Sequence, residues 1–160
     1  MENFIYSIPT TIYFGKGQIE HVAQAVRPYG KKALIVYGGG SVKKNGIFDR
    51  VTEILEHEGI AWEELGGVEP NPRIETVRKG AEICKAGNIE VVLPIGGGST
   101  IDCAKIIAAG ALYDGDAWDL VLDGKKIQAA LPIVAVLTLA ATGSEMDTAA
   151  VISDMASNNK

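Results

Sequence analysis

Residues that bind metals or act as nucleophiles are scarce in this sequence. Its 160 residues include two histidines and two cysteines. His21 and His57 fall near the polar faces of expected helices, and the sequence has no HxxxH pair or clustered His/Asp set. Cys84 and Cys103 lie at apolar positions in separate segments without a CxxC spacing, which indicates buried free thiols rather than a disulfide. We therefore expect no metal site within the chain.

Basic charge and long apolar runs are also in short supply. The chain carries 15 Lys and Arg against 20 Asp and Glu, a formal net charge of -5. No basic stripe is visible, which argues against nucleic acid, although a local basic pocket would still accept a phosphate. The longest uncharged apolar run, residues 129–141, is interrupted by Pro132 and is shorter than the roughly 18 residues of a membrane helix. The first ten residues lack a signal-peptide pattern, so we expect a cytoplasmic protein.

What is present indicates one globular α/β domain. Hydrophobic residues make up 47% and charged residues 22%, the balance of a packed rather than a disordered chain. Short apolar runs, typical of strands buried on both faces of a parallel sheet, occur at residues 32–37, 60–65, 89–95 and 131–139. Apolar residues at helical spacing occupy 44–58, 74–86 and 100–109. This alternation predicts an open parallel sheet with helices on both faces.

Segments outside this alternation have weaker patterns. Residues 4–14 are rich in β-branched and aromatic side chains and are predicted to form one or two edge strands, as in a hairpin. A short helix is expected over 18–26, and a polar loop with a short helix over 114–126. Residues 149–153 are a candidate for one more strand.

The turn after the third apolar run carries the most functional information. Its sequence is Gly96-Gly97-Gly98-Ser99-Thr100, at the carboxyl end of a strand, where ligands bind in open α/β folds. Glycines let the backbone approach a ligand. Ser99 or Thr100 would cap the next helix, whose N–H groups attract a phosphate. The pattern fits a pyrophosphate cradle, and equally a tight turn that holds no ligand.

A similar turn, Gly38-Gly39-Gly40-Ser41, follows the first apolar run. Folds that prefer NAD usually place an acidic side chain near the adenosine ribose. This turn offers Ser41, Lys43 and Lys44 instead, and hydroxyl and ammonium groups would hold a 2′-phosphate. The sequence therefore favours NADP(H) over NAD(H). The alternative is that the two lysines simply form a solvated helix start.

No complete catalytic site is visible. Neither turn has the GxGxxG spacing of the Rossmann fingerprint, and neither has the lysine of a P-loop. Asp102, one turn into the helix, would accept hydrogen bonds from a ribose or a nicotinamide amide, or simply favour the helix dipole. Ser144 lacks the GxSxG context of a nucleophile elbow.

Four motifs in order resemble the iron-containing (group III) alcohol dehydrogenases. PIGGGSTIDCAK at 94–105 is similar to their GGGSxxDxAK segment, and VLTLAATGSEMD at 136–147 to the segment after their fourth strand. VYGGGSVKKNGIFDRV at 36–51 and GGVEPNPRIETVRKG at 66–80 resemble the branch of NADPH-dependent butanol dehydrogenases and aldehyde reductases. The likeness implies a dehydroquinate synthase-like nucleotide-binding domain over residues 1–160.

The resemblance also implies roles for individual residues. Those expected to contact the dinucleotide are Gly39, Gly40, Ser41, Asn71, Gly97, Gly98, Ser99, Asp102, Thr138, Thr142, Asp147 and Lys160. The first three and Asn71 would meet the adenosine ribose and 2′-phosphate, while the second turn would hold the pyrophosphate. Position 147, often Asn in this branch, is Asp here.

Family members are more than twice as long. Their helical C-terminal half, absent from these 160 residues, binds iron or zinc through one Asp and three His. The resemblance implies hydride transfer between nicotinamide and a metal-bound alcohol or aldehyde, in a homodimer paired through N-terminal strands. Two alternatives are a stand-alone nucleotide-binding module without turnover and a glycerol or dehydroquinate-type relative. This chain alone is expected to be inactive.

Overall fold

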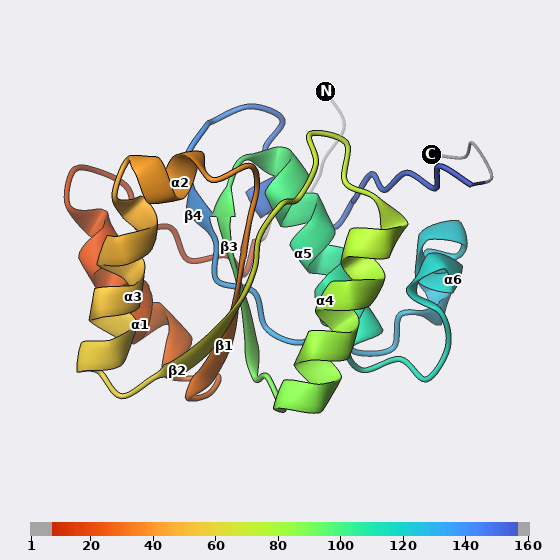
Figure 1. Cartoon of the computed structure of the whole chain (residues 1–160), viewed down its shortest axis with the longest axis horizontal. Helices are drawn as coiled ribbons and strands as arrows, with labels where there is room; N and C mark the ends of the chain where they lie inside the picture. The colour runs from red at the N-terminus through yellow and green to blue at the C-terminus, as the bar shows by residue number, and fades with distance from the viewer. Residues whose placement is uncertain (1–7, 157–160) are drawn as a thin grey trace, which may run out of the picture.

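Four parallel strands form the centre of the structure. The computed structural model describes residues 8–156. The strands are β1 (Lys32–Tyr37), β2 (Ala61–Leu65), β3 (Val91–Gly96) and β4 (Val136–Leu137). Their order across the sheet is β2-β1-β3-β4 (Figure 1). The predicted open parallel sheet is confirmed.

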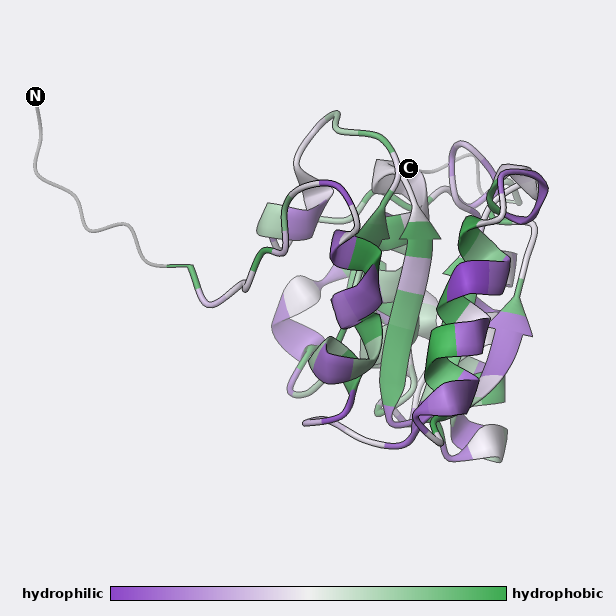
Figure 2. Ribbon diagram, turned by 90° about the vertical axis from the view of Figure 1, so that its left-hand side faces the viewer, coloured by the Kyte–Doolittle hydropathy of each residue, from purple (hydrophilic) through white to green (hydrophobic). Residues whose placement is uncertain are grey.

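The two central strands, β1 and β3, are the apolar ones. In β1 every residue after Lys32 is buried, and β3 is buried throughout. Figure 2 shows β3 coloured mainly hydrophobic, whereas the edge strand β2 is coloured hydrophilic. β1 pairs with both neighbours, with Lys32 opposite Ala61 and Ala33 opposite Val91. Because all pairings are parallel, the carboxyl ends of the strands meet at one edge.

Helices cover both faces of the sheet, as the sequence predicts (Figure 1). One face carries α1 (Val22–Val26) and α3 (Ile47–His57). The other carries α4 (Ile74–Gly87) and α5 (Gly98–Gly110), with α6 (Ala117–Leu122) packed on their outer side. The shorter elements are η1 (Gln18–His21), α2 (Ser41–Lys44), η2 (Gly124–Lys126) and η3 (Ser144–Met146).

The core on the α3 side is built around aromatic rings. Phe48 lies edge-on to Tyr37, with ring centroids 5.3 Å apart, and to Trp62, at 5.8 Å. Edge-to-face contacts of this kind stabilise beyond the area that they bury. The aromatic cluster ties α3 to both β1 and β2.

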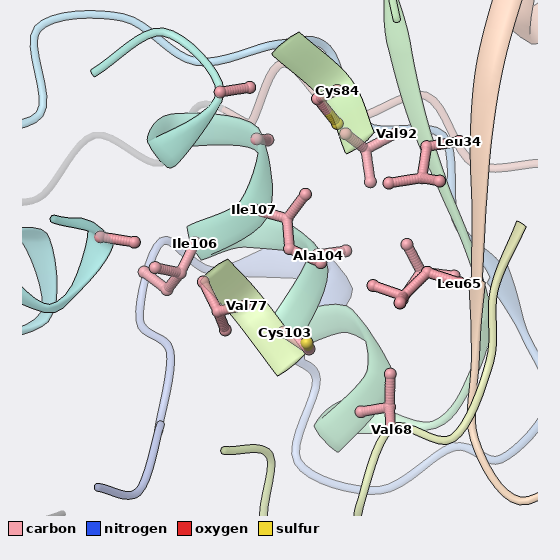
Figure 3. Close-up of a cluster of buried hydrophobic side chains, with 14 of the residues drawn as sticks. Leu34, Leu65, Val68, Val77, Cys84, Val92, Cys103, Ala104, Ile106 and Ile107 are labelled. Carbon is pink, nitrogen blue, oxygen red and sulfur yellow. The ribbon is translucent and has the colours of Figure 1, made fainter. Parts of the chain in front are cut away.

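The core on the α5 side contains both cysteines. Cys84 and Cys103 are buried and unpaired, as predicted. Figure 3 shows them among the side chains that join α4 and α5 to the sheet. Burial raises the pKa of each thiol to about 12, so both remain protonated and unreactive at neutral pH.

Two predicted elements differ in the described structure. The helix expected over 44–58 is interrupted, because Asn45 ends α2 and Gly46, with φ 78°, precedes α3. The strand expected over 131–139 is reduced to β4 and an isolated bridge between Ile133 and Val92. Pro132 has no N–H to offer a ladder, and β4 is partly exposed at the edge of the described sheet.

Of the segments with weaker sequence patterns, the predicted short helices are present, and the predicted strands are not present within residues 8–156. Residues 8–14 form no strand and are largely exposed, while the rest of the predicted hairpin lies outside the described residues. Residues 149–153 form a single bridge, between Ser153 and Arg73. The short helices expected near residues 18–26 and 114–126 are present. No helix within residues 8–156 is long and apolar enough to cross a membrane.

Candidate functional site

The structure brings both glycine-rich turns to the same edge of the sheet. Tyr37 pairs with Ile95 in the register of β1 and β3, so Gly38 and Gly96 leave adjacent strands side by side. A Cβ atom built on Gly38 would lie 4.0 Å from the Thr100 hydroxyl, which belongs to the other turn. The two turns therefore form one surface.

The second turn delivers the chain directly into α5. Gly97 is the N-cap residue of this helix and has no side chain to occupy the first N–H groups. The expectation that Ser99 or Thr100 caps the helix is wrong, because both residues lie inside its first turn. Ser99 instead donates its hydroxyl hydrogen to the Pro70 carbonyl at 2.5 Å. The first N–H groups of a helix have no intrahelical acceptor, and this end suits an anion.

The glycines of this site serve two different needs. A Cβ on Gly96 would lie 2.5 Å from Thr100 Oγ1, so this position is closed by packing. A Cβ on Gly97 would meet only Leu139 Cβ, at 3.8 Å, and nothing lies within 4 Å of those built on Gly39 and Gly40. Open space therefore lies over both turns, where a ligand can approach the backbone.

The segment after β4 folds back over the second turn. The Thr138 N–H donates to the Gly96 carbonyl at 3.0 Å. Thr142 Oγ1 lies 3.2 Å from where a Cβ of Gly98 would stand. Thr138, Thr142, Gly97 and Gly98, all predicted to contact the cofactor, are thus brought together.

The first turn leads into α2, where Lys43 forms a charge pair with Glu64 of β2 that sequence reasoning missed. Ser41 is exposed at the start of α2, after Gly40 with φ 92°. The Lys43 ammonium donates to Glu64 Oε2 at 2.7 Å, and Tyr37 Oη donates to the same oxygen at 3.0 Å. The hydrogen bond from Lys43 lowers the pKa of the Glu64 carboxyl, and Glu64 raises the pKa of Lys43.

Asp102 and Asp147 belong to one hydrogen-bonded network with Lys105. Asp102 Oδ1 accepts from the Ser144 hydroxyl at 2.5 Å, and Oδ2 accepts from the Val151 N–H at 3.0 Å. Asp147 Oδ1 accepts from Lys105 Nζ at 2.8 Å, which lowers the pKa of Asp147. Sequence reasoning missed Lys105. Its signal was a lysine within the apolar stretch of α5.

Two predicted residues remain, Asn71 and Lys160. Asn71 is exposed beside Pro70, whose carbonyl contacts Ser99, so it lies close to the second turn. Lys160 falls outside the described residues. Within residues 8–156, no three His, Cys, Asp or Glu side chains gather to hold a metal ion.

Two cavities lie away from the glycine-rich turns. One, of about 740 Å³, is a groove between α1 and α3, where Arg50 pairs with Glu20 and Arg27 with Glu58. The other, of about 330 Å³, lies at the opposite end of α4 and is lined by Cys84 and Leu131. The arginines of the first groove are paired with glutamates, and Lys85 and Glu90 beside the second cavity bond to backbone groups, so the candidate site remains the sheet edge.

Comparisons with known proteins identify the family of the chain. The family profile described as iron-containing alcohol dehydrogenase matches residues 9–160. The chain is 60% identical over 160 residues to NADH-dependent butanol dehydrogenase A of Clostridium acetobutylicum, and 42% identical over 163 residues to the NADPH-dependent aldehyde reductase YqhD of Escherichia coli. Each alignment spans 100% of this chain and 41% of the relative's length.

Solved structures give the same result for the fold. The crystal structure of NADH-dependent butanol dehydrogenase A from Thermotoga maritima superposes with a TM-score of 0.93 at 47% identity, covering 98% of this chain and 40% of that one. The crystal structure of Escherichia coli YqhD gives 0.89 at 42% identity, covering 97% and 40%.

Proposed function

Because the chain belongs to the iron-containing alcohol dehydrogenase family, we propose that it is the cofactor-binding part of an NAD(P)H-dependent alcohol dehydrogenase or aldehyde reductase. The observation that carries the proposal is the pair of glycine-rich turns at one sheet edge, with open space over Gly39, Gly40 and Gly97. The full enzyme would transfer hydride between nicotinamide and an alcohol or aldehyde.

Each part of the edge has a role in this proposal. The uncapped N-terminus of α5 holds the pyrophosphate through the N–H groups of Gly98 and Ser99. The first turn, with Ser41 at its exposed end, binds the adenosine ribose. Thr138 and Thr142 line the cofactor from the side of the returning segment, where the Thr142 hydroxyl lies close to Gly98.

The substrate half of the reaction is assigned to other parts of the full-length enzyme. The chain spans 41% of the length of its relatives, and residues 8–156 contain no cluster of three metal-binding side chains. A divalent metal, when bound, would supply Lewis-acid polarisation of the substrate oxygen. We expect the 160-residue chain to bind cofactor without turnover.

For the cofactor, we propose that the first turn accepts NADP(H) as well as NAD(H). Residues 38–41 have no acidic side chain to repel a 2′-phosphate. Ser41 and Lys44, at and just after this turn, are exposed. Glu64 neutralises Lys43, which weakens the case for a strong NADP(H) preference. The named relatives include both NADH-dependent and NADPH-dependent enzymes.

Fluorescence titration of the chain with NADH and with NADPH tests the proposal. Gly97→Val would fill the open space over the second turn without backbone strain, because Gly97 has φ -93°. We expect it to weaken dinucleotide binding by about tenfold or more. Gly124→Val is the matched control, since a Cβ on Gly124 would have nothing within 4 Å and Gly124 lies in η2, away from the sheet edge. Equal binding by wild type and Gly97→Val would contradict the assigned cradle.

A further inference from the structure

Lys105 is the one basic residue in α5, and it is nearly covered. Its side chain is 13% exposed, and its neighbours along the helix, Ala104 and Ile106, belong to the apolar core. Taking an ammonium group out of water is costly unless its hydrogens are bonded and its charge is balanced. A lysine in this position must therefore have a specific set of partners.

Those partners all come from one returning segment. Lys105 Nζ donates to Ser144 Oγ at 2.9 Å, to Asp147 Oδ1 at 2.8 Å and to the Ala149 carbonyl at 2.6 Å. An ammonium group has three hydrogens to donate, so its capacity is used fully. The lysine thereby fixes three points of residues 144–149 to α5.

Asp102 completes the attachment from the preceding turn of the helix. It accepts from the Ser144 hydroxyl and from the Val151 N–H, and its Oδ1 lies 3.8 Å from Lys105 Nζ. Ser144, 4% exposed, accepts from the lysine and donates to the aspartate. Two carboxylates and one ammonium thus form a connected network, which rigidifies a loop more than isolated pairs do.

The attached segment is also the wall of the second glycine-rich turn. Ser144 Cβ lies 3.8 Å, and Thr142 Oγ1 3.2 Å, from the position of a Cβ on Gly98. Between them Gly143 adopts φ 80°, a left-handed conformation that sharply reverses the chain. The position of Thr142 over Gly98 therefore depends on where Ser144 is held.

We propose that Lys105 is a positioning residue that holds residues 142–151 against α5 and so sets the shape of the cofactor cradle over Gly98. This inference rests on the proposed function, since the cradle matters only when a dinucleotide binds there. Lys105 does not contact the cofactor. It acts through Ser144 and Asp147, and its effect on affinity is one of preorganisation.

The test compares Lys105→Met with Lys79→Met, which replaces an exposed lysine of α4. For Lys105→Met we expect NADH and NADPH to bind about tenfold more weakly, and amide hydrogens of residues 142–151 to exchange faster. Exchange in β1 and β3 should not change. Lys79→Met should match wild type in both measurements.

A second variant keeps the proposal falsifiable if Lys105→Met fails to fold. Asp147→Asn removes one charge at a half-exposed position and should produce a smaller change of the same kind. Unchanged affinity and unchanged exchange in 142–151 would overturn the proposal, and so would exchange that rises uniformly over the whole sheet. Failure of wild type to bind either dinucleotide would instead sink the proposed function, while exchange still reports whether Lys105 anchors the segment.

Discussion

At the scale of single residues, the pairing of Lys43 with Glu64 controls how much positive charge the first turn presents. The two side chains are 40% and 42% exposed and 2.7 Å apart. Lys43 also lies over the rings of Tyr37 and Phe48, 4.9 and 4.4 Å from their centroids. Its ammonium is therefore directed toward β2 and the aromatic cluster. A 2′-phosphate would have to compete with Glu64 for it.

Replacing Glu64 by glutamine should shift cofactor preference toward NADPH. The change removes a negative charge close to the first turn and releases the Lys43 ammonium. We expect the ratio of NADPH to NADH affinity to rise roughly two- to fivefold, the scale of an exposed charge pair, in fluorescence titrations at low salt. Glu63→Gln is the control, because Glu63 pairs with Lys32 at 2.8 Å. A ratio that rises equally in both variants would contradict a local effect.

The positions of the candidate residues could be predicted from sequence better than their partners. Glycines after apolar runs identify strand ends, so the gathering of both turns follows from a parallel sheet alone. Ser99 was expected to cap α5, but its hydroxyl meets the Pro70 carbonyl. Asp102 bonds to Ser144 and to the backbone of Val151. Such contacts join residues far apart in the chain, and no local pattern encodes them.

At the scale of elements, the close approach of α4 and α5 depends on a glycine of α4, Gly80, that faces Ile107 of α5. A Cβ on Gly80 would lie 2.4 Å from Ile107 Cδ1 and 2.7 Å from its Cγ1. Ile107 is fully buried between α4 and the sheet, so it has little room to move. The missing side chain is what allows this packing.

Gly80→Ala should therefore destabilise the chain although alanine favours helices. The gain in helix propensity is about 1 kcal/mol, whereas overpacking a rigid core costs about 1–3 kcal/mol. We expect a lower Tm and a lower free energy of unfolding in urea. Ile107→Val removes the methyl group nearest to Gly80. Gly80→Ala should therefore lower the free energy of unfolding less when it is added to Ile107→Val than when it is added to wild type. Lys79→Ala is the exposed control, and a Gly80→Ala chain more stable than wild type would refute the packing argument.

Helices and strands with a complete periodic pattern of apolar residues were predicted correctly. Elements whose bounds depend on a turn conformation or on an adjacent strand were not. β1, β3 and α4 occupy nearly the expected residues because burial on one or both faces imposes the pattern. The break at Gly46 and the short β4 depend on a turn conformation and on whether a further strand lies alongside. Local hydrophobicity contains neither kind of information.

At the scale of the whole molecule, residues 12–14 are apolar and lie outside the core. Ile12 is 62% exposed and Phe14 94% exposed. Tyr13 stacks on His21, with ring centroids 4.8 Å apart. Exposed aromatic and branched side chains in succession are typical of surfaces that another chain covers, which agrees with the predicted homodimer.

The dimer prediction can be tested on the chain itself. We expect sedimentation velocity to detect a dimer, and Ile12→Ser/Phe14→Ser to shift the population to monomer, since a symmetric interface loses the same contacts twice. Leu122→Ser is the matched control, because Leu122 is 66% exposed and lies in α6. A monomeric wild type at all concentrations, or dissociation by the control, would contradict a dimer formed through this segment.

The central place of β1 also determines how this fold is reached. β1 must find β2 across α3, and then β3 across α4, with Ala33 opposite Trp62 and Val91. Among residues 8–156 no ladder is closed by a hairpin, so each must overcome the entropy of closing a long loop before its contacts form. Within the described sheet β4 pairs with β3 and lies at the edge. The topology therefore favours assembly outward from β1, at rates well below those of helical bundles of equal length.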